Sequence, residues 1–206
     1  MIGNNLEIEQ HAAPEVLRVL AKHRCVGCGE CCRWPGQVIL YPDDIGRIAA
    51  KLRATRENFL RRHCVVVWWT SYKGIHFRVA LARKQTEREC LFLDGSKCSI
   101  HEFKPVKCRA GPAGWSWISN PDAFWYYVRN SPSFSHDTES LPLAEANYWF
   151  RGTLARELAM SEVNSLASLA VIFNVSEELL QSLQIVEFKE DLNVRRSSAA
   201  TAATGR

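Results

Sequence analysis

Apolar residues in the second half of the chain recur every three to four positions, which is the spacing of one face of an α-helix. This periodicity predicts four helices, over residues 122–129, 144–160, 162–173 and 176–183. Ser176 offers the last of them a capping side chain, and Glu177 and Glu178 place negative charge in its first turn. The sequence becomes low in complexity from residue 195, so we expect a disordered tail over 191–206.

The first half of the chain mixes helical and extended patterns. Apolar residues on one face predict helices over residues 14–22, 42–52 and 56–63. Thr55 is suited to cap the third of these helices. Two runs of β-branched and aromatic residues, 65–69 and 75–81, are separated by a polar turn and predict a β-hairpin.

Shorter elements follow this hairpin. We expect a strand over 90–93 that ends in a turn, one helical turn over 98–103, and a loop over 108–112.

Composition narrows the class of protein. The chain has 206 residues, a net charge of +4 and 47% hydrophobic residues, which suits a globular protein with a core of its own. The charge is too mild to demand a nucleic-acid partner. The longest apolar run, Val65–Trp69, is far too short to span a bilayer, and the first residues lack the features of a signal peptide. We therefore expect a cytoplasmic protein in a reducing compartment, bound to neither membrane nor nucleic acid.

The candidate chemistry lies in the cysteines. Four of them fall within eight residues in the sequence C-V-G-C-G-E-C-C, at Cys25, Cys28, Cys31 and Cys32. Three more follow at Cys90, Cys98 and Cys108. Thiolates two residues apart on a glycine-containing turn converge on a soft metal centre. Gly27 and Gly29 permit positive φ in this turn, and we expect no regular structure over 24–37.

In a reducing compartment this spacing favours metal binding over disulfides. The C-x2-C-x2-C run resembles the start of a bacterial ferredoxin motif, but the next cysteine is adjacent instead of three residues on. Cys31 and Cys32 should point apart and serve different ligands or metals. Seven thiols exceed the four that one zinc ion or one [4Fe–4S] cluster needs, so a polynuclear centre, two centres, or one centre with spare thiols all stay open. Cys64 has no partner at such spacing and is expected to be a plain core thiol.

Basic residues lie beside several cysteines, where a cation would favour the thiolate form. Arg33 and Arg109 are the candidates for contacts to a bound centre. His101 follows Cys98 by three residues and could complete a site of three cysteines and one histidine, although a structural hydrogen bond is the commoner role.

These residues resemble the CxxCxxCC family of zinc- or iron-chelating, YkgJ-type cysteine cluster domains. The resemblance covers about residues 24–112, and it rests on C-V-G-C-G-E-C-C-R, Y-P-D-D-I at 41–45, C-L-F-L-D-G-S-K-C-S-I-H and F-K-P-V-K-C-R. It implies that all seven cysteines of the pattern form the metal site, without fixing the metal. This chain has His101 where the family usually has tyrosine and Lys104 where the family usually has arginine. Some larger proteins with this domain are flagellin lysine N-methylases, but this chain has no G-x-G loop after a strand for a nucleoside cofactor.

Two other stretches could carry chemistry. The aromatic residues of 115–127 could stack nucleobases or line a pocket, but only Arg129 adds a basic residue there, so packing in an aromatic core is favoured. His136, Asp137 and Glu139 lie in a Ser- and Pro-rich stretch, where a solvated turn is favoured over acid–base catalysis.

The sequence thus predicts an α+β fold, with short β-strands in a small cysteine-cluster metal-binding core and a helical C-terminal half. The metal-binding domain would span 14–112 and a helical extension packed on it would span 113–190. One hypothesis is an iron–sulfur cluster, [4Fe–4S], or an iron centre in an oxidoreductase or a peptide- or small-molecule-modifying enzyme, with its catalytic residues unassigned. The alternative is a structural zinc site in a protein- or peptide-binding module without catalysis.

Overall fold

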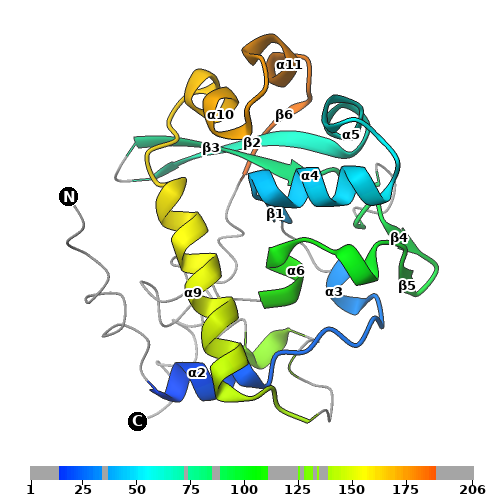
Figure 1. Cartoon of the computed structure of the whole chain (residues 1–206), viewed down its shortest axis with the longest axis vertical. Coiled ribbons are helices and arrows are strands. Elements are labelled where there is room, and N and C mark those ends of the chain that lie inside the picture. Colours follow the sequence, from blue (N-terminus) through cyan, green and yellow to red (C-terminus); the bar gives the residue numbers. More distant parts are fainter. Residues whose placement is uncertain are drawn as a thin grey trace, which may run out of the picture.

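The computed structural model describes residues 14–33, 37–71, 74–84, 89–110, 125, 128–131, 134 and 139–188. The elements of the first half are α2 (Pro14–Ala21), α3 (Glu30–Arg33), β1 (Ile39–Leu40), α4 (Pro42–Lys51), α5 (Arg56–His63), β2 (Cys64–Ser71), β3 (Gly74–Leu81), β4 (Leu93–Asp94) and β5 (Lys97–Cys98). They are followed by η1 (His101–Phe103), α6 (Val106–Ala110), α9 (Leu143–Ala159), α10 (Leu166–Phe173), α11 (Glu177–Gln181) and β6 (Ile185–Glu187). Strands and helices share the first half and helices dominate the second (Figure 1), which confirms the α+β fold with a helical C-terminal half.

The larger sheet has four strands in the order β1-β3-β2-β6. β2 and β3 form the predicted hairpin, antiparallel from the pair Cys64 and Leu81 to the pair Ser71 and Gly74. β1 adds to the outer edge of β3 in antiparallel fashion. β6 pairs with β2 in parallel, with Ile185 opposite Val66. The sequence did not predict β6, because an element of three residues is too short to show a period.

The sheet is apolar on both faces. Val66 and Val79 belong to the main core, and successive residues of a strand point to opposite faces. Val65, Val67 and Ala80 accordingly form a smaller cluster on the other face, with Val186 and Phe188 from β6 and the residue after it packed against them.

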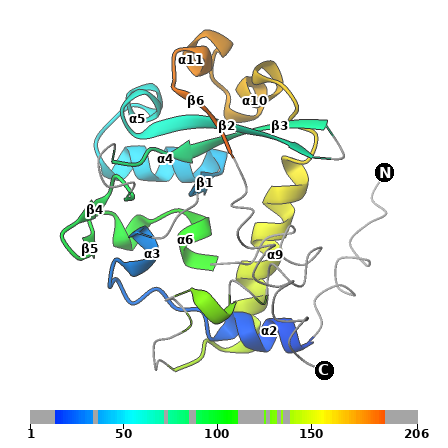
Figure 2. The same ribbon diagram turned by 180° about the vertical axis from the view of Figure 1, so that it is seen from behind.

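The molecule is layered along its long axis (Figures 1 and 2). In the view of Figure 1, helices α10 and α11 lie above the strands and α4 lies below them, with α3, α6 and the β4–β5 hairpin farther down. The long helix α9 runs alongside these layers toward α2. One main core joins the layers, since it includes Phe173 of α10, Ile48 of α4 and Val106 of α6.

Helix starts in the first half follow the predicted caps. Thr55 accepts a hydrogen bond of 3.1 Å from the backbone N–H of Asn58 at the start of α5, as expected. At the start of α4 the Asp44 carboxylate accepts the N–H of Tyr41 at 3.1 Å, and Pro42 occupies the first turn.

Two helix starts in the second half are also capped by serine. Ser176 caps α11 by accepting the N–H of Leu179 at 3.1 Å, as predicted. The prediction that the preceding helix starts at 162 is wrong. Ser165 accepts the N–H of Ser168 at 3.1 Å, which makes α10 begin at Leu166.

Several expectations fall on residues outside the described ranges. They are the tail 191–206, the loop at 111–112, most of the aromatic segment 115–127, His136 and Asp137. Only Trp125 and residues 128 and 129 of the predicted helix 122–129 are described, and they are helical. The division into a domain over 14–112 and an extension over 113–190 stays a prediction. Within the described ranges, no helix has both the length and the apolar character that crossing a membrane requires.

Candidate metal centre

The first cysteine segment is a tight turn that leads into a short helix. Gly27 and Gly29 have φ values of 79° and 80°, so their predicted positive φ is confirmed. A Cβ on Gly29 would lie 2.6 Å from the carbonyl oxygen of Ser96, so glycine also permits the β4–β5 hairpin to approach this turn. The expectation of no regular structure over 24–37 is wrong in part. Helix α3 holds Cys31 and Cys32, because the N–H of Cys32 bonds to the carbonyl of Gly29 at 3.0 Å and closes a helical turn.

The adjacent cysteines of α3 have different surroundings. Cys31 is exposed, whereas Cys32 is half-buried and packs against the main core. The carbonyl of Cys32 accepts the N–H of Cys90 at 2.8 Å. The first cysteine segment is therefore joined to the second through the backbone as well as through side chains.

The second segment carries its cysteines on three different local structures. Cys90 forms an isolated bridge with Arg83, and the strand β4 begins only at Leu93, so the predicted strand over 90–93 lies too early in the chain. The chain must first turn at residues 91 and 92 to form the β4–β5 hairpin, which places Cys98 in a strand. The predicted helical turn over 98–103 is therefore confined to η1.

Cys108 lies in helix α6, so the predicted loop over 108–112 is wrong at its start. The carbonyl of Pro105 accepts the N–H of Cys108 at 3.0 Å and that of Arg109 at 3.2 Å. A proline fits just before a helix, since it needs no hydrogen bond of its own there. This turn directs the thiol of Cys108 toward the other cysteines.

Three thiols are in direct contact. Cys32 hydrogen-bonds to both Cys90 and Cys98, and these bonds are the main cause that raises the pKa of Cys32. The same bonds lower the pKa of Cys90 and of Cys98 below that of a free thiol. The Cys32 thiol thus lies within hydrogen-bonding distance of two other thiols, and sulfur atoms brought together in this way can hold a soft cation as thiolates.

Cys108 and Cys25 lie next to this group of three thiols. Cys108 is half-buried as a residue, but its thiol is enclosed: lost hydration is the largest cause that raises its pKa. Negative charge on Cys90, Cys98 and Cys25 raises the pKa of Cys108 further. Within the described ranges, no three Cys, His, Asp or Glu side chains are arranged as the ligands of a bound ion would be. The contacts between pairs of thiols are therefore the geometric evidence for a site.

Two cations near the thiols, Arg83 and Lys104, were not among the candidates from the sequence. Arg83 interacts electrostatically with Cys90, Cys32 and Cys108, which opposes the lowering of its own pKa by burial. The positive charge of Lys104 adds to the lowering of the Cys98 pKa, which the hydrogen bond with Cys32 dominates, and it partly opposes the rise of the Cys108 pKa. Arg83 has no motif spacing that would have revealed it, whereas Lys104 occupies the place of the family's usual arginine.

Arg33 and Arg109 bind backbone and acidic groups around the cysteines. Arg33 donates to Glu89 at 2.8 Å and to the carbonyl of Gly95, which braces the β4–β5 hairpin. Arg109 donates to the carbonyl of Lys104 at 3.2 Å and packs 5.9 Å from the ring of Trp149. Their predicted contact with a bound centre stays a prediction.

His101 lies over the first cysteine turn. Its Nε2 is 3.4 Å from the carbonyl oxygen of Cys25 and 3.1 Å from Nζ of Lys104. These contacts fit a structural hydrogen bond, and ligation by His101 stays a prediction. Cys64 lies in the main core at 5% exposure, and burial is the cause that raises its pKa, which fits a plain core thiol.

Comparison with protein families gives one match. The model of the CxxCxxCC family, described as a "putative zinc- or iron-chelating domain", matches residues 24–130. Separate comparisons with curated proteins and with solved structures gave no match.

Proposed function

This chain belongs to the CxxCxxCC family of zinc- or iron-chelating domains, whose model matches just over half of the chain, and we propose that its thiols bind one metal centre between the cysteine segments 25–32 and 90–108. The contacts of the Cys32 thiol with the thiols of Cys90 and Cys98 carry this proposal, because they bring sulfur atoms from both cysteine segments together. The donor set is soft and fits zinc, iron or an iron–sulfur cluster.

We assign Cys32, Cys90, Cys98 and Cys108 as the inner ligands. The remaining thiols of the family pattern, Cys25, Cys28 and Cys31, complete the proposed set. Binding through the inner four would join α3 to the β4–β5 hairpin and to α6, so the metal would contribute folding energy to this part of the chain.

An iron–sulfur cluster is our first choice of centre. Its support is the C-x2-C-x2-C run and the surplus of thiols over the four that a single zinc site needs. Four thiolates give a bound [4Fe–4S] core or zinc ion a net charge of about −2, which the nearby Arg83 and Lys104 would offset. When bound, such a cluster would supply electron transfer to a protein partner, or assist modification of a peptide or small molecule.

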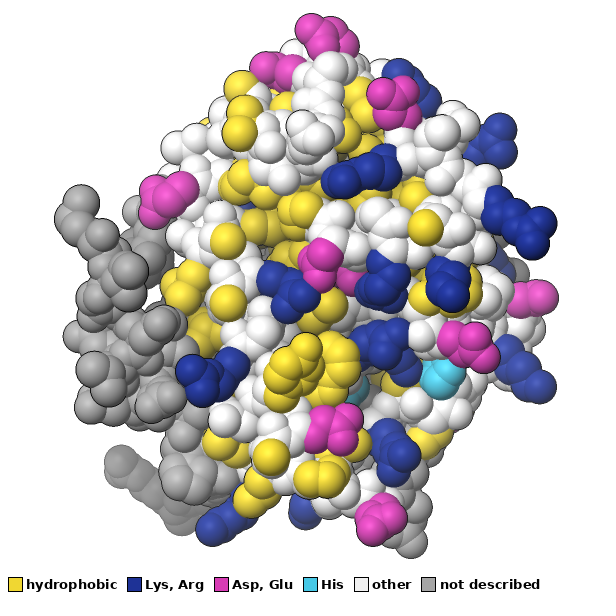
Figure 3. Space-filling view, in the orientation of Figure 1, with side chains coloured by type: hydrophobic (Ala, Val, Ile, Leu, Met, Phe, Trp, Pro, Cys, Tyr) yellow, Lys and Arg dark blue, Asp and Glu magenta, His cyan; other side chains and the backbone are white. Residues whose placement is uncertain are grey.

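A structural zinc site is the second candidate. The enclosed thiol of Cys108 favours it, since a closed site with four thiolates leaves no open position for a substrate. In either case we place the protein in a reducing compartment such as the cytoplasm, where closely spaced cysteines stay reduced and can bind a metal. Basic side chains are spread over the face shown in Figure 3 and interleaved with acidic ones, which supports a protein or peptide partner over a nucleic acid.

Anaerobic purification, followed by a visible spectrum and elemental analysis of one sample, tests these proposals. A brown protein that absorbs near about 400 nm and holds iron and sulfide would support the cluster. A colourless protein with tightly held zinc would support the structural site. A chain that retains neither metal after reconstitution under reducing conditions would overturn both.

A further inference from the structure

The Y-P-D-D-I sequence at 41–45 is part of the family resemblance, although it contains no cysteine. The structure shows what its second aspartate contacts. Asp44 is fully buried, and its carboxylate accepts the N–H of Val106 at 3.0 Å and a guanidinium N–H of Arg47 at 2.6 Å. It also accepts the N–H of Tyr41 at the start of its own helix. One buried carboxylate therefore ties α4 to the first residue of α6.

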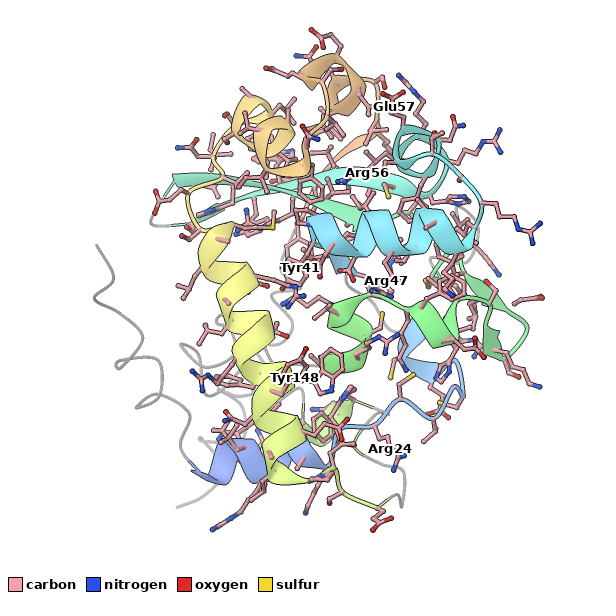
Figure 4. All side chains as sticks on the ribbon, in the orientation of Figure 1. Arg24, Tyr41, Arg47, Arg56, Glu57 and Tyr148 are labelled. Carbon is pink, nitrogen blue, oxygen red and sulfur yellow. The ribbon has the colours of Figure 1, made fainter. Side chains whose placement is uncertain are left out.

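Arg47 extends these contacts along the chain before Cys108. Its guanidinium donates to the carbonyl of Phe103, and to that of Lys104 at 3.0 Å. Figure 4 shows its side chain lying between α4 and the segment that carries η1 and α6. Arg109 donates to Lys104 and Glu102 in the same stretch. Carbonyl groups at 102, 103 and 104 are thus all held by guanidinium donors.

This stretch of backbone joins Cys98 to Cys108. The helix that carries Cys108 has five residues, far fewer than a helix needs to be stable by itself in water. Its position must therefore come from contacts outside it. A buried carboxylate is costly unless its hydrogen bonds are satisfied, and Asp44 places one of them on a backbone far away in the sequence. Capping of α4 explains the hydrogen bond from Tyr41, whereas the hydrogen bond from Val106 goes beyond that local role.

We propose that Asp44 and Arg47 form a clamp that positions Cys108 for metal binding, without contacting the metal themselves. This inference rests on the proposed metal function. The clamp holds the backbone of 103–106 through charge-assisted hydrogen bonds, which are shorter and stronger than those between neutral groups. Mutation of residues that orient a metal ligand typically weakens metal binding by about 10- to 100-fold.

Arg47→Met tests the clamp. The reduced, metal-free chain would be titrated with Zn²⁺ against a chromophoric chelator to obtain the apparent Kd. We expect the apparent Kd of Arg47→Met to rise by about 10- to 100-fold. Arg47→Lys should recover part of this loss, because lysine keeps the charge but cannot hold two carbonyls with a planar fork. Arg47→Lys also carries the test if Arg47→Met does not fold.

Arg156→Met is the matched control. Arg156 also binds α4, through Asp43 at 2.5 Å, but its hydrogen bonds and ring contact are with Asp43, Gly152 and Tyr41, outside the 102–108 stretch. Its apparent Kd for Zn²⁺ should match that of the unmodified chain. A second control combines Arg47→Met with Cys108→Ser. If the clamp acts through Cys108, Arg47→Met should cause no further loss in that background.

Three results would overturn the clamp: Zn²⁺ binding by Arg47→Met as tight as in the unmodified chain, an equal loss in Arg156→Met, or an undiminished effect of Arg47→Met in the Cys108→Ser background. Each is distinct from failure of the proposed metal function, in which the unmodified chain itself would not bind Zn²⁺ or iron.

Discussion

The sheet layer and the cysteine layer of this protein are held together in different ways. The sheet layer, formed by β1, β2, β3 and β6 with α10 and α11, is stabilised mainly by buried apolar side chains. The cysteine layer, formed by α3, the β4–β5 hairpin, η1 and α6, consists of elements of two to five residues. Its parts are joined by backbone and charge-assisted hydrogen bonds, such as those from Arg33 and Arg47.

Two buried cysteines show what this difference means for chemistry. Burial is the cause that raises the pKa of Cys64 in the sheet layer, and it is the largest cause for Cys108 in the cysteine layer. Of these two cysteines, only Cys108 has a pKa that is also changed by the charges of other thiols and of Lys104. Burial alone therefore does not identify a ligand. A thiol can coordinate a metal ion together with other thiols only where those thiols lie beside it.

The largest expected effect separates these two cysteines. Cys108→Ser should lose most of the bound metal, whereas Cys64→Ser should retain it. Elemental analysis of both variants, purified side by side, measures this. Structural zinc can contribute about 10–16 kcal/mol to a small site, so hydrogen exchange in α3 and α6 should also accelerate in Cys108→Ser. Full metal retention in Cys108→Ser, or metal loss in Cys64→Ser, would reverse the assignment.

A core substitution tests the sheet layer. Phe173 is fully buried in α10, and Phe173→Ala should lower the free energy of unfolding by about 3–5 kcal/mol through lost burial and a cavity. Urea denaturation measures this. Zn²⁺ affinity under conditions where the variant is folded should not change. Val171→Ala on the exposed side of the same helix is the control, and it should cost no more than about 0.5 kcal/mol. Equal effects of the two variants would show that α10 is not part of the core.

The contact between α6 and α9 should contribute less. Glu157 accepts hydrogen bonds from Lys107 at 2.6 Å and from the hydroxyl of Tyr41 at 2.7 Å. Burial alone raises the pKa of Glu157, but Lys107 and these hydrogen bonds outweigh it and hold the pKa below its usual value. We expect Glu157→Gln to cost about 1–3 kcal/mol at pH 7.

The same contact predicts a dependence on pH. Because the folded pKa is lowered, the stabilisation is complete above the ordinary glutamate pKa of about 4.3 and is lost as the pH falls through the folded value. Thermal unfolding of the metal-free forms should therefore show the difference between the unmodified chain and Glu157→Gln shrinking below pH of about 4. Glu162→Gln, at an exposed position, should show no such difference. A gap that widens in acid would contradict the assignment.

The smallest expected effect concerns a helix cap. Thr55→Ala removes the acceptor for the N–H of Asn58 and should cost about 1 kcal/mol. Thr55→Ser keeps the acceptor and should stay close to the unmodified chain. Chemical denaturation resolves the two, and equal losses would mean that the hydroxyl does not cap α5.

The sequence predicted the elements whose signal is local. The hairpin of β2 and β3, and helices α4, α5, α9 and α11, have long apolar periods or capping residues, and the structure confirms them. The strand β6 and the helix α6 were missed, because elements of three and five residues carry no measurable period. Their conformation depends on partners distant in the sequence, namely β2 for β6 and Asp44 for α6.

The sequence predicted candidate ligands, which stay a prediction, and it did not predict all the charged groups around them. Spacing alone singled out the seven cysteines, of which Cys32, Cys90 and Cys98 are in direct contact. It singled out Arg33 and Arg109 because they adjoin cysteines in the chain. The structure also brings Arg83 and Lys104 near the thiols, since proximity in space depends on how β3 and η1 pack. A single sequence does not contain that information in any local pattern.

The parallel pairing of β6 with β2 bears on how the protein is made. During synthesis, Cys108 emerges from the ribosome well before Ile185, the residue that pairs with Val66. All the proposed metal ligands would therefore have left the ribosome while the sheet still lacks β6. A growing chain could take up its metal on a scaffold whose edge along β2 is still open, and an open strand edge can pair with the wrong chain. The interval before β6 arrives is thus the stage at which this fold is most exposed to misassembly.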